Sequence, residues 1–263
     1  MKEKIKIFQI DAFTDRVFGG NPAAVCVLDQ WLPDQVMQNI STENNLSETA
    51  FAVKREFDYE IRWFTPTTEV ALCGHATLAL AHVLFNFFEH PDNTINFFSR
   101  HSGALSVIKK GEFLTLDFPS DKIKQVAGPQ EILNAFSTQP LETYQGKTDF
   151  LLLFKSQKEI EQAEPDMAIL KKSKARGIMI TAPGEEVDFV SRFFAPGSGV
   201  DEDPVTGSAH TTLTPFWSKK LNKKSLHAKQ LSSRGGDLLC EYLDDRVNIT
   251  GQAVTYLIGE III

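Results

Sequence analysis

The sequence predicts an α+β fold with two pseudo-symmetric domains, each a curved, mostly antiparallel sheet wrapped around a central helix. Three observations lead to this prediction. Two stretches of the chain repeat each other, each half holds many β-rich runs, and each half holds one helix that is apolar nearly all round. Such a helix is buried on every side, and a curved sheet can enclose it.

The internal repeat begins at Arg62–Pro66 and again at Arg192–Pro196, a constant offset of 130 residues (192 − 62 = 130). At the same offset, Cys73 falls opposite Asp203. The glycine segments that follow lie 133 residues apart (207 − 74 = 133), so we expect three inserted residues in the second copy. A repeat this long predicts a cleft between two equivalent helix starts.

The first half reads as strands, one amphipathic helix and one buried helix. Alternating apolar residues and β-branched runs predict the strands, and the small residues of the second helix allow close packing. The predicted strands are Ile5–Ile10, Ala23–Leu28, Glu48–Val53, Tyr59–Thr65, Thr94–Ser99, Ala104–Ile108 and Phe113–Phe118, and the helices are Pro33–Asn44 and His75–Phe88.

The second half repeats this order after Pro119–Gln130, a proline-containing segment that predicts the crossover between domains. We place the domains at 1–118 and 119–252, with 253–263 as a last strand that completes the first. Short helices are expected between the first two strands of this half. The predicted strands are Phe150–Phe154, Gly177–Ala182, Val187–Phe194, Gln230–Ser232, Leu238–Leu243, Val247–Thr250 and Ala253–Ile262, and the buried helix is Ser208–Leu221.

Composition excludes several classes of function. A net charge of −7 provides no basic stripe to neutralise phosphates, so nucleic acid is not expected as a partner. No apolar run reaches the roughly 20 residues that span a bilayer, so no membrane association is expected. Met1 leads directly into a strand pattern, and the three cysteines form neither a disulfide framework nor a zinc motif. A cytoplasmic location is therefore predicted.

The two buried helices begin in residues suited to binding an anion. Gly74 and Gly207 precede them, and His75 and Ser208 lie in the cap region. The first turn of a helix leaves amide groups without partners and carries about +0.5 of a charge. Two such ends at one cleft would bind a carboxylate or an enolate. The alternative is ordinary capping by Ser208 beside a glycine turn.

Three further side chains are candidates for proton transfer. Glu48 stands where a helix gives way to an apolar strand, which would desolvate it and raise its pKa. The alternative is a solvent-exposed glutamate in a turn, and spacing alone does not favour Glu48 over Glu43 or Glu69. Asp203 belongs to a run of three acids, which is a second proton-handling site or a solvated loop. Cys73 is a thiolate activated by the helix start or a buried small residue.

His75 and His210 are each either functional or packed, hydrogen-bonded histidines. His75 is the better functional candidate, because it stands at the helix start whereas His210 lies within the helix.

No nucleotide or metal motif occurs in the sequence. The glycines lack the G-x-G-x-x-G spacing, and neither a P-loop, H-E-x-x-H nor C-x-x-C is present. We therefore expect a reaction without metal or organic cofactor.

The motifs together resemble those of the phenazine-biosynthesis F (PhzF-like) isomerase family. The matches run in order over essentially the whole chain, which makes the resemblance specific. They are Asp11–Thr14, Gly20–Val25, Asn45–Phe51, Cys73–Thr77, Glu202–Ala209 and Gln230–Gly236.

The resemblance implies a diaminopimelate epimerase-like fold and a homodimer. It implies a cofactor-independent isomerase that moves a proton on a small carboxylated metabolite, as in the isomerisation of trans-2,3-dihydro-3-hydroxyanthranilate. By resemblance, Glu48 is the catalytic acid/base, assisted by His75 and Asp203. Substrate-binding residues are then Gly74, Gly207 and Ser208, with Cys73 beside them.

Two other functions stay open from the sequence. One is an epimerase or racemase that acts through Cys73. The related epimerases use two cysteines, whereas the position opposite Cys73 at the constant offset is Asp203. The other is a ligand-binding protein that keeps the site without turnover.

Overall fold

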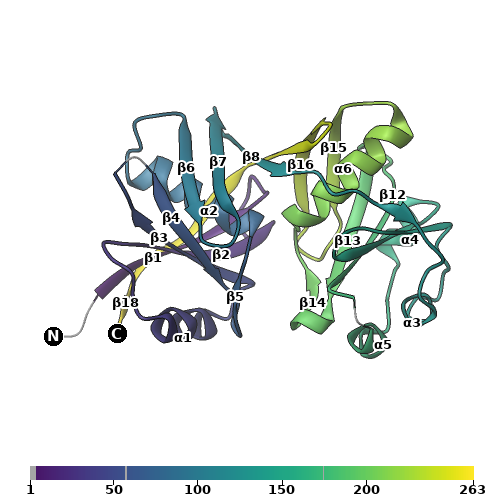
Figure 1. Cartoon of the computed structure of the whole chain (residues 1–263), viewed down its shortest axis with the longest axis horizontal. Helices are drawn as coiled ribbons and strands as arrows, with labels where there is room; N and C mark the ends of the chain where they lie inside the picture. The colour runs from purple at the N-terminus through teal and green to yellow at the C-terminus, as the bar shows by residue number, and fades with distance from the viewer. Residues whose placement is uncertain (1–3, 57, 174) are drawn as a thin grey trace. The chain divides into compact units, whose positions relative to one another are not determined.

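The computed structural model describes residues 4–56, 58–173 and 175–263. The chain divides into two compact units, Met1–Asp117 with Thr250–Ile263, and Phe118–Ile249. Each unit contains a sheet and one long helix against it, together with one shorter helix in the first unit and several in the second (Figure 1). The expected α+β class, with a curved sheet and a central helix in each half, is confirmed.

The first unit contains one mixed sheet with the order β18–β1–β2–β3–β4–β6–β7–β8, and the short β5 pairs with β4. Among the strand pairs of the described residues here, β2–β3 and β4–β6 are parallel. The strands are β1 (Lys4–Ala12), β2 (Asn21–Leu28), β3 (Glu48–Lys54), β4 (Tyr59–Phe64), β5 (Glu69–Val70), β6 (Thr94–Ser99), β7 (Gly103–Lys110), β8 (Phe113–Pro119) and β18 (Ala253–Ile262). The helices are α1 (Asp34–Asn44) and α2 (Gly74–Phe87).

The second unit repeats this order as β9–β10–β11–β12–β13–β15–β16, with β14 paired to β13. In the described part of this unit the corresponding pairs, β11–β12 and β13–β15, are likewise parallel. The strands are β9 (Lys124–Gln125), β10 (Glu142–Gln145), β11 (Asp149–Leu153), β12 (Gly177–Pro183), β13 (Phe189–Ala195), β14 (Val200–Asp203), β15 (Ser225–Gln230), β16 (Gly236–Leu243) and β17 (Arg246–Gly251). The helices are α3 (Gln130–Leu133), α4 (Gln157–Glu161), α5 (Met167–Lys172), η1 (Pro196–Ser198) and α6 (Gly207–Leu221).

The central helices α2 and α6 are buried over most of their length, as their all-round apolar sequences predict. Helix α2 contacts β1, β2, β3 and β18, and α6 contacts β15 and β16. Pro215 within α6 has no N–H to donate to the carbonyl of Thr211. The backbone N–H of Asp121 donates to that carbonyl at 3.0 Å instead, so the helix continues through the proline.

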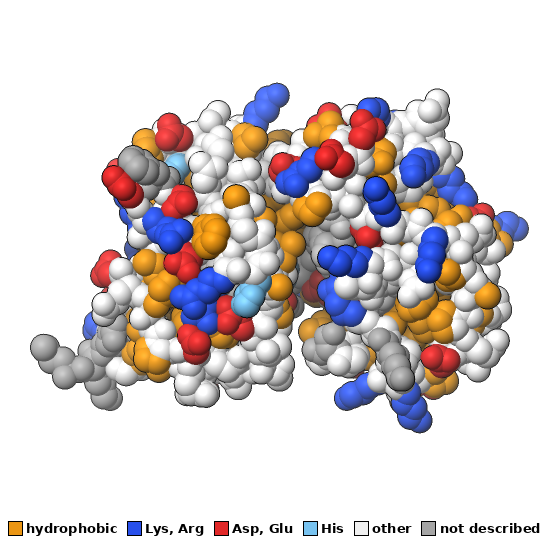
Figure 2. All heavy atoms as spheres, viewed as in Figure 1, with side chains coloured by type: hydrophobic (Ala, Val, Ile, Leu, Met, Phe, Trp, Pro, Cys, Tyr) orange, Lys and Arg blue, Asp and Glu red, His pale blue; other side chains and the backbone are white. Residues whose placement is uncertain are grey.

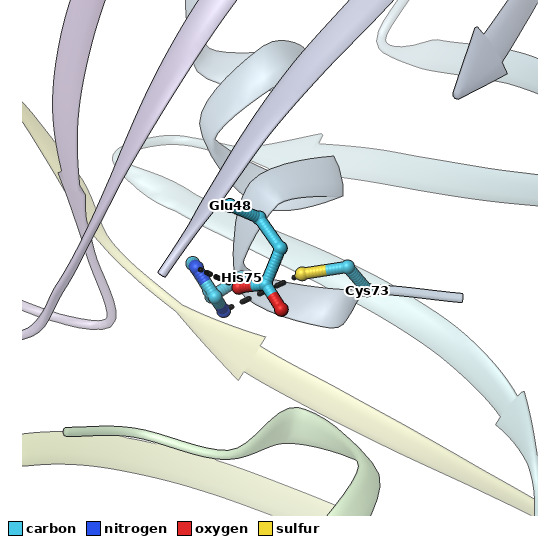
Figure 3. Close-up of side chains that lie close together, drawn as sticks. All are labelled: Glu48, Cys73 and His75. Atoms are coloured by element: carbon cyan, nitrogen blue, oxygen red, sulfur yellow. Dashed lines mark hydrogen bonds and ion pairs between the residues drawn. The ribbon is translucent and has the colours of Figure 1, made fainter. Parts of the chain in front are cut away.

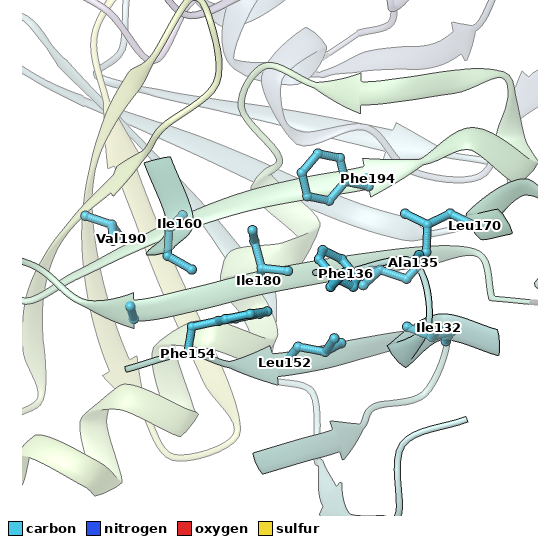
Figure 4. Packing of buried hydrophobic residues seen from close by; sticks show 12 residues of the cluster. Ile132, Ala135, Phe136, Leu152, Phe154, Ile160, Leu170, Ile180, Val190 and Phe194 are labelled. Carbon is cyan, nitrogen blue, oxygen red and sulfur yellow. The ribbon is translucent and has the colours of Figure 1, made fainter. Parts of the chain in front are cut away.

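Short helices bury a second apolar layer in each unit. In the first unit, α1 packs Met37 and Ile40 against strand residues such as Phe51. In the second, α3, α4 and α5 cover a cluster that includes Leu152 and Ile180 (Figure 4). Because side chains alternate along a strand, each sheet buries both of its faces.

An arginine–glutamate pair is repeated in the two units and shows how the copies correspond. The guanidinium of Arg62 donates to both carboxylate oxygens of Glu69, each at 2.7 Å. Arg192 binds Glu202 in the same bidentate way, at 2.7 and 2.9 Å. These pairs tie β5 to β4 and β14 to β13, immediately before the two central helices.

The strand register corrects one part of the sequence alignment. Phe64 pairs with Glu69, and Phe194 pairs with Glu202, so the offset has already changed from 130 to 133 at the glutamates (202 − 69 = 133). The three inserted residues therefore lie before Glu202, in the segment that forms η1. The earlier alignment had placed the insertion after Asp203.

The expected strand at Gln230–Ser232 was also wrong, because β15 is Ser225–Gln230. Its inward positions are Leu226, Ala228 and Gln230, and only the first is a large apolar residue. The alternation was therefore too weak to identify the strand from its sequence.

The described part of the chain contains no helix that is both long and apolar enough to cross a membrane. On the face drawn in Figure 2, Lys and Arg side chains lie among Asp and Glu side chains on each unit. That face therefore carries no basic stripe, in agreement with the negative net charge.

Truncating a leucine in the second core should reveal how strongly that unit depends on it. Leu152 is fully buried, whereas Leu239 in the same unit is 44% exposed. We expect Leu152→Ala to lower the free energy of unfolding by about 2–5 kcal/mol, because it leaves a cavity. The matched Leu239→Ala should change it by less than about 0.5 kcal/mol. Urea unfolding of both variants checks this, and equal losses would contradict the core assignment.

Candidate active site

Three predicted residues of the first unit lie together at the start of α2. Glu48 is the first residue of β3, Cys73 is the N-cap residue of α2, and His75 is the second residue of that helix. Glu48 Oε2 lies 3.2 Å from His75 Nε2, and Cys73 Sγ lies 3.5 Å from His75 Nδ1 (Figure 3). The two ends of one imidazole thus contact a carboxylate and a thiol.

Burial keeps the imidazole of His75 neutral. Its side chain is 4% exposed, and desolvation lowers the pKa of His75 to about 3. At neutral pH its contact with Glu48 is therefore between a neutral ring and a carboxyl group. The Nε2–Oε2 contact is short, but Nε2 has no hydrogen bond of adequate geometry within the described residues. The oxygen consequently lies off the direction of the ring N–H.

Asn21 contacts the other nitrogen of His75, and the sequence analysis assigned it no role. It begins β2, is fully buried, and places Nδ2 at 3.1 Å from His75 Nδ1. In this amide orientation the NH2 group donates to Nδ1, so the ring proton is on Nε2, the nitrogen that contacts Glu48. Asn21 therefore selects which nitrogen of His75 can act toward the carboxylate.

The turn before Asn21 requires glycine. Gly20 has φ +60°, and a Cβ there would lie 2.1 Å from the carbonyl oxygen of Ala12. Buried Asp11 holds the same loop, since its carboxylate accepts the N–H of Phe18 at 2.8 Å. The segment from Asp11 to Asn21 thus positions the side-chain amide of Asn21 beside the ring of His75.

The N-terminus of α2 has no side-chain cap. Cys73, the N-cap residue, makes no capping hydrogen bond, and its carbonyl accepts the hydroxyl of Thr77 at 2.6 Å. The first backbone N–H groups of α2, which form the positive end of the helix dipole, are therefore not capped by the side chain of the N-cap residue. That arrangement suits a bound carboxylate.

The start of α6 has the same form. Thr206 is the N-cap residue and makes no capping bond, and His210 Nδ1 lies 2.9 Å from the carbonyl of Thr206. His210 is fully buried, as expected for a packed histidine, and burial lowers its pKa to about 4. The corresponding positions are Cys73 and Thr206 (206 − 73 = 133), and His75 and Ser208 (208 − 75 = 133).

Ser208 is not a helix cap in the structure. It is the second residue of α6, after Gly207, and is partly exposed. Its hydroxyl makes no hydrogen bond to another described residue. The capping alternative is therefore wrong, and the hydroxyl is available to a ligand.

The three acidic residues before α6 differ in their contacts and exposure. Glu202 pairs with Arg192, and Asp201 is exposed. Asp203 is partly buried, and its Oδ2 accepts the hydroxyl of Thr206 at 2.5 Å. Asp203 therefore lies at the helix start as a bonded side chain.

Gln230 holds this loop and was missed as an individual residue. Its amide donates to the carbonyl of Asp203 at 2.7 Å and accepts the backbone N–H of Thr206 at 2.8 Å. Gln230 is 1% exposed, at the end of β15. A glutamine at an inward strand position was the available signal, since a buried amide needs partners.

Among the described residues, one group of side chains could hold a metal ion. Glu48, Cys73 and His75 place one ligand atom each within 4.8 Å of one another. The three cysteines are buried and form no disulfide. Burial raises the pKa of Cys26 and of Cys240 to about 12, so neither is a ready thiolate.

Comparison with known proteins decides the family. The family model described as phenazine biosynthesis-like protein matches residues 10–259. The chain belongs to the PhzF family. An uncharacterized isomerase from Pseudomonas aeruginosa is 49% identical, over 98% of each chain. A mouse phenazine biosynthesis-like domain-containing protein is 41% identical, over 97% of this chain and 98% of that one.

Solved structures agree with this family and with the epimerase-like fold. A PhzF-family protein from Enterococcus faecalis has a TM-score of 0.95 and 46% identity, over 98% of this chain and 99% of that one. A hydroxyproline epimerase from Agrobacterium vitis has a TM-score of 0.65 and 11% identity, over 100% and 94%. The second likeness shows the fold alone, and confirms the epimerase-like architecture of this PhzF family member.

Replacing Asn21 should change the protonation of His75. In Asn21→Asp, a carboxylate beside Nδ1 favours the protonated ring, so the pKa of His75 should rise from about 3 and the neutral ring should carry its proton on Nδ1. Asn21→Leu should remove the preference for a proton on Nε2 of the neutral ring, without adding a charge beside it. Imidazole 15N chemical shifts recorded against pH measure both effects.

His210 provides an internal control for this experiment. Its Nδ1 must donate to the carbonyl of Thr206, so its 15N shifts should not change in either variant. If the His75 shifts also stay constant, Asn21 does not set the tautomer.

Proposed function

We propose that this PhzF family member is a cofactor-independent isomerase that moves a proton on a small carboxylated metabolite. An isomerase-type function agrees with the family and with the names of its relatives. Cyclic acids of the trans-2,3-dihydro-3-hydroxyanthranilate type are the substrate class to test, by resemblance to the family's namesake activity.

The contact of Glu48 with His75 carries this proposal. Glu48 is 18% exposed, so it is reachable by a ligand yet largely removed from water. Its carboxylate faces a neutral imidazole at the positive end of α2. A base in such a place can take a proton from carbon while the charge that develops is stabilised nearby.

Glu48 removes a proton from carbon and returns it to another carbon of the same molecule. His75, with its proton on Nε2, orients the substrate or assists the transfer. The amides from Gly74 onward bind the substrate carboxylate or the enolate that forms from it.

The helix start of the second unit is assigned to the same reaction. Gly207 and Ser208 offer amides and a hydroxyl for substrate binding, and Asp203 orients the substrate or assists the proton transfer. The support is that α6 begins like α2, without a side-chain cap. Asp203 is held at that start by Thr206 and Gln230.

Removing the base should stop proton exchange. Candidate acids are incubated with the protein in deuterated water, and deuterium incorporation is followed by mass spectrometry. We expect Glu48→Gln to lower the exchange rate by at least ~100-fold, because the amide cannot accept the proton. Glu43→Gln, an exposed glutamate on α1, is the matched control and should exchange at the wild-type rate. Equal exchange by wild type and Glu48→Gln would reject the assignment.

The same measurement separates the two alternatives. An epimerase that acts through Cys73 loses exchange in Cys73→Ala and produces the mirror-image centre. The structural counterpart of Cys73 is Thr206, so these two positions do not provide a pair of thiols. A silent binding protein binds the acids but exchanges none of them.

A cytoplasmic location and a homodimer are also proposed. Three cysteines that form no disulfide support a reducing compartment. For the dimer, the support is strand β18, which in the described residues pairs with β1 alone. It exposes Tyr256, Leu257, Ile258 and Ile262, the last by 60%. Long apolar edge strands are commonly covered, and a second copy could pair with this one antiparallel.

A charge on this edge should dissociate the dimer. Ile258 is 50% exposed on β18. In Ile258→Lys, a charge replaces an exposed apolar side chain of the proposed interface in each copy, so we expect a shift from dimer to monomer in analytical ultracentrifugation. Leu239→Lys on the second unit is the control and should remain dimeric. A monomeric wild-type protein would contradict the proposal directly.

A further inference from the structure

The second unit contains a cavity of about 550 Å³ that the proposed reaction does not use. Its wall is formed by the segment before β9, by β10, by the end of β16 and by the C-terminal half of α6. Pro215 is the residue of this wall that lies nearest the start of α6, and it follows Gly207 by about 12 Å along the helix axis. The cavity is therefore separate from the helix start assigned to the substrate, and its volume is that of a small-molecule site.

Ring side chains line the cavity together with Pro215. Phe216 is 8% exposed, and Tyr144 and Tyr242 are half-buried. The rings of Tyr144 and Phe216 meet edge to face, with their centroids 5.2 Å apart. Such a lining favours a ligand with a flat ring, because ring contacts add to the gain from removing apolar surface from water.

Two lysines of the cavity wall have no acidic partner. The side chains of Lys122 and Lys219 form neither an ion pair nor a hydrogen bond with another described residue. A third, Lys220, lies 3.3 Å from Glu142 and over the ring of Phe216. A cation in the last turn of a helix suits the helix dipole, which accounts for Lys219. It does not account for Lys122, which comes from the segment before β9.

The two carboxylates of the wall are already bound by other groups. Oδ2 of Asp121 accepts the hydroxyl of Thr212 and the backbone N–H of Lys147, each at 3.1 Å. The carboxylate of Asp244 lies 3.6 Å from Nζ of Lys224. The two charged side chains of this wall that have no partner among the described residues are therefore both positive, although the chain as a whole carries a net charge of −7.

Hydrogen bonds hold the wall together without a ligand. Because Pro215 has no N–H, the carbonyl of Thr211 accepts the N–H of Asp121 instead, which fixes the segment before β9 on α6. The backbone N–H of Ser120 donates to the carbonyl of Asp245 at 2.8 Å, which fixes the same segment to the end of β16. A site formed in advance loses little binding free energy to ordering.

We propose that this cavity binds a small molecule that joins a flat ring to an anionic group, either a carboxylate or a phosphate. The ring packs among Phe216, Tyr144 and Tyr242. The ammonium groups of Lys122 and Lys219 bind the anionic group. The site shares no residue with the proposed proton transfer.

Methyl NMR with a ring-shaped anion tests the site. Ile123 lines the cavity, whereas Ile169 of the same unit packs against the core under the short helices. In protein labelled with 13C at its isoleucine methyl groups, 1-naphthoate or 1-naphthyl phosphate should shift the Ile123 signal saturably, because an aromatic ring changes the magnetic field beside it. The Ile169 signal should not move. Ile123→Val removes the first signal and so assigns it.

Exposed lysines provide the variants and their control. Lys122→Met and Lys219→Met should each weaken binding about 10-fold, the effect of losing one charge-assisted hydrogen bond. Lys171→Met removes an equally exposed lysine from the last turn of α5, outside the wall, and should bind as the wild type does. The uncharged analogue 1-naphthamide should bind at least about 10-fold more weakly than the anions.

The outcomes separate this site from the proposed isomerase. A saturable Ile123 shift that weakens in both lysine variants supports the site, and the tighter of the two anions identifies its anionic group. A constant Ile123 signal, equal affinity for the anions and the amide, or unchanged affinity in either lysine variant overturns it. A protein that binds these anions here but exchanges no acid keeps this site and loses the proposed function.

Discussion

The structure of each unit depends on enclosing one helix that is apolar on every side. Helix α2 buries residues from Gly74 to Leu84, so strands must surround it, and its polar ends are the parts that can reach water. At the N-terminal end, buried amides remain without a side-chain cap. Enclosing α2 in strands therefore also places the positive end of its dipole beside the first residues of β2 and β3.

Strands β2 and β3 are parallel, and for this reason their first residues both lie near the N-terminal end of α2. Ala23 pairs with Glu48, so both strands begin near the same edge of the sheet. Asn21 lies at the start of one and Glu48 at the start of the other. His75 lies at the helix start that they flank, and each of its nitrogens meets one of these side chains. Sheet topology, more than any local motif, positions the candidate site.

Much of this could be predicted from the sequence, since the relevant signals are strong and local. The internal repeat showed two equivalent units, and uninterrupted apolar patterns located both central helices. A strand with few large apolar residues, β15, gave too weak an alternation to be placed. The exact point of the insertion could not be found either, because it depends on which residue of β14 pairs with which residue of β13.

The residues of the candidate site differed in how readily the sequence alone identified them. Glu48 and His75 belong to dense motifs, so they could be named. Asn21 and Gln230 act through buried amides whose partners lie 54 and 24 residues away in the chain. Contacts at that separation leave no periodic signal, and only the folded sheet shows them.

The two helix starts have diverged while the geometry beneath them was kept. In α2 the hydroxyl of Thr77 bonds back to the N-cap carbonyl, and in α6 the ring of His210 makes the equivalent bond (210 − 77 = 133). The framework at both starts is therefore equivalent, whereas the side chains above it are not. The first start carries a thiol and an imidazole beside a carboxylate, and the second carries two hydroxyls and Asp203. The first backbone amides of a helix attract an anion whichever side chains surround them. The shared backbone framework at the two starts can therefore persist while the side chains above it change.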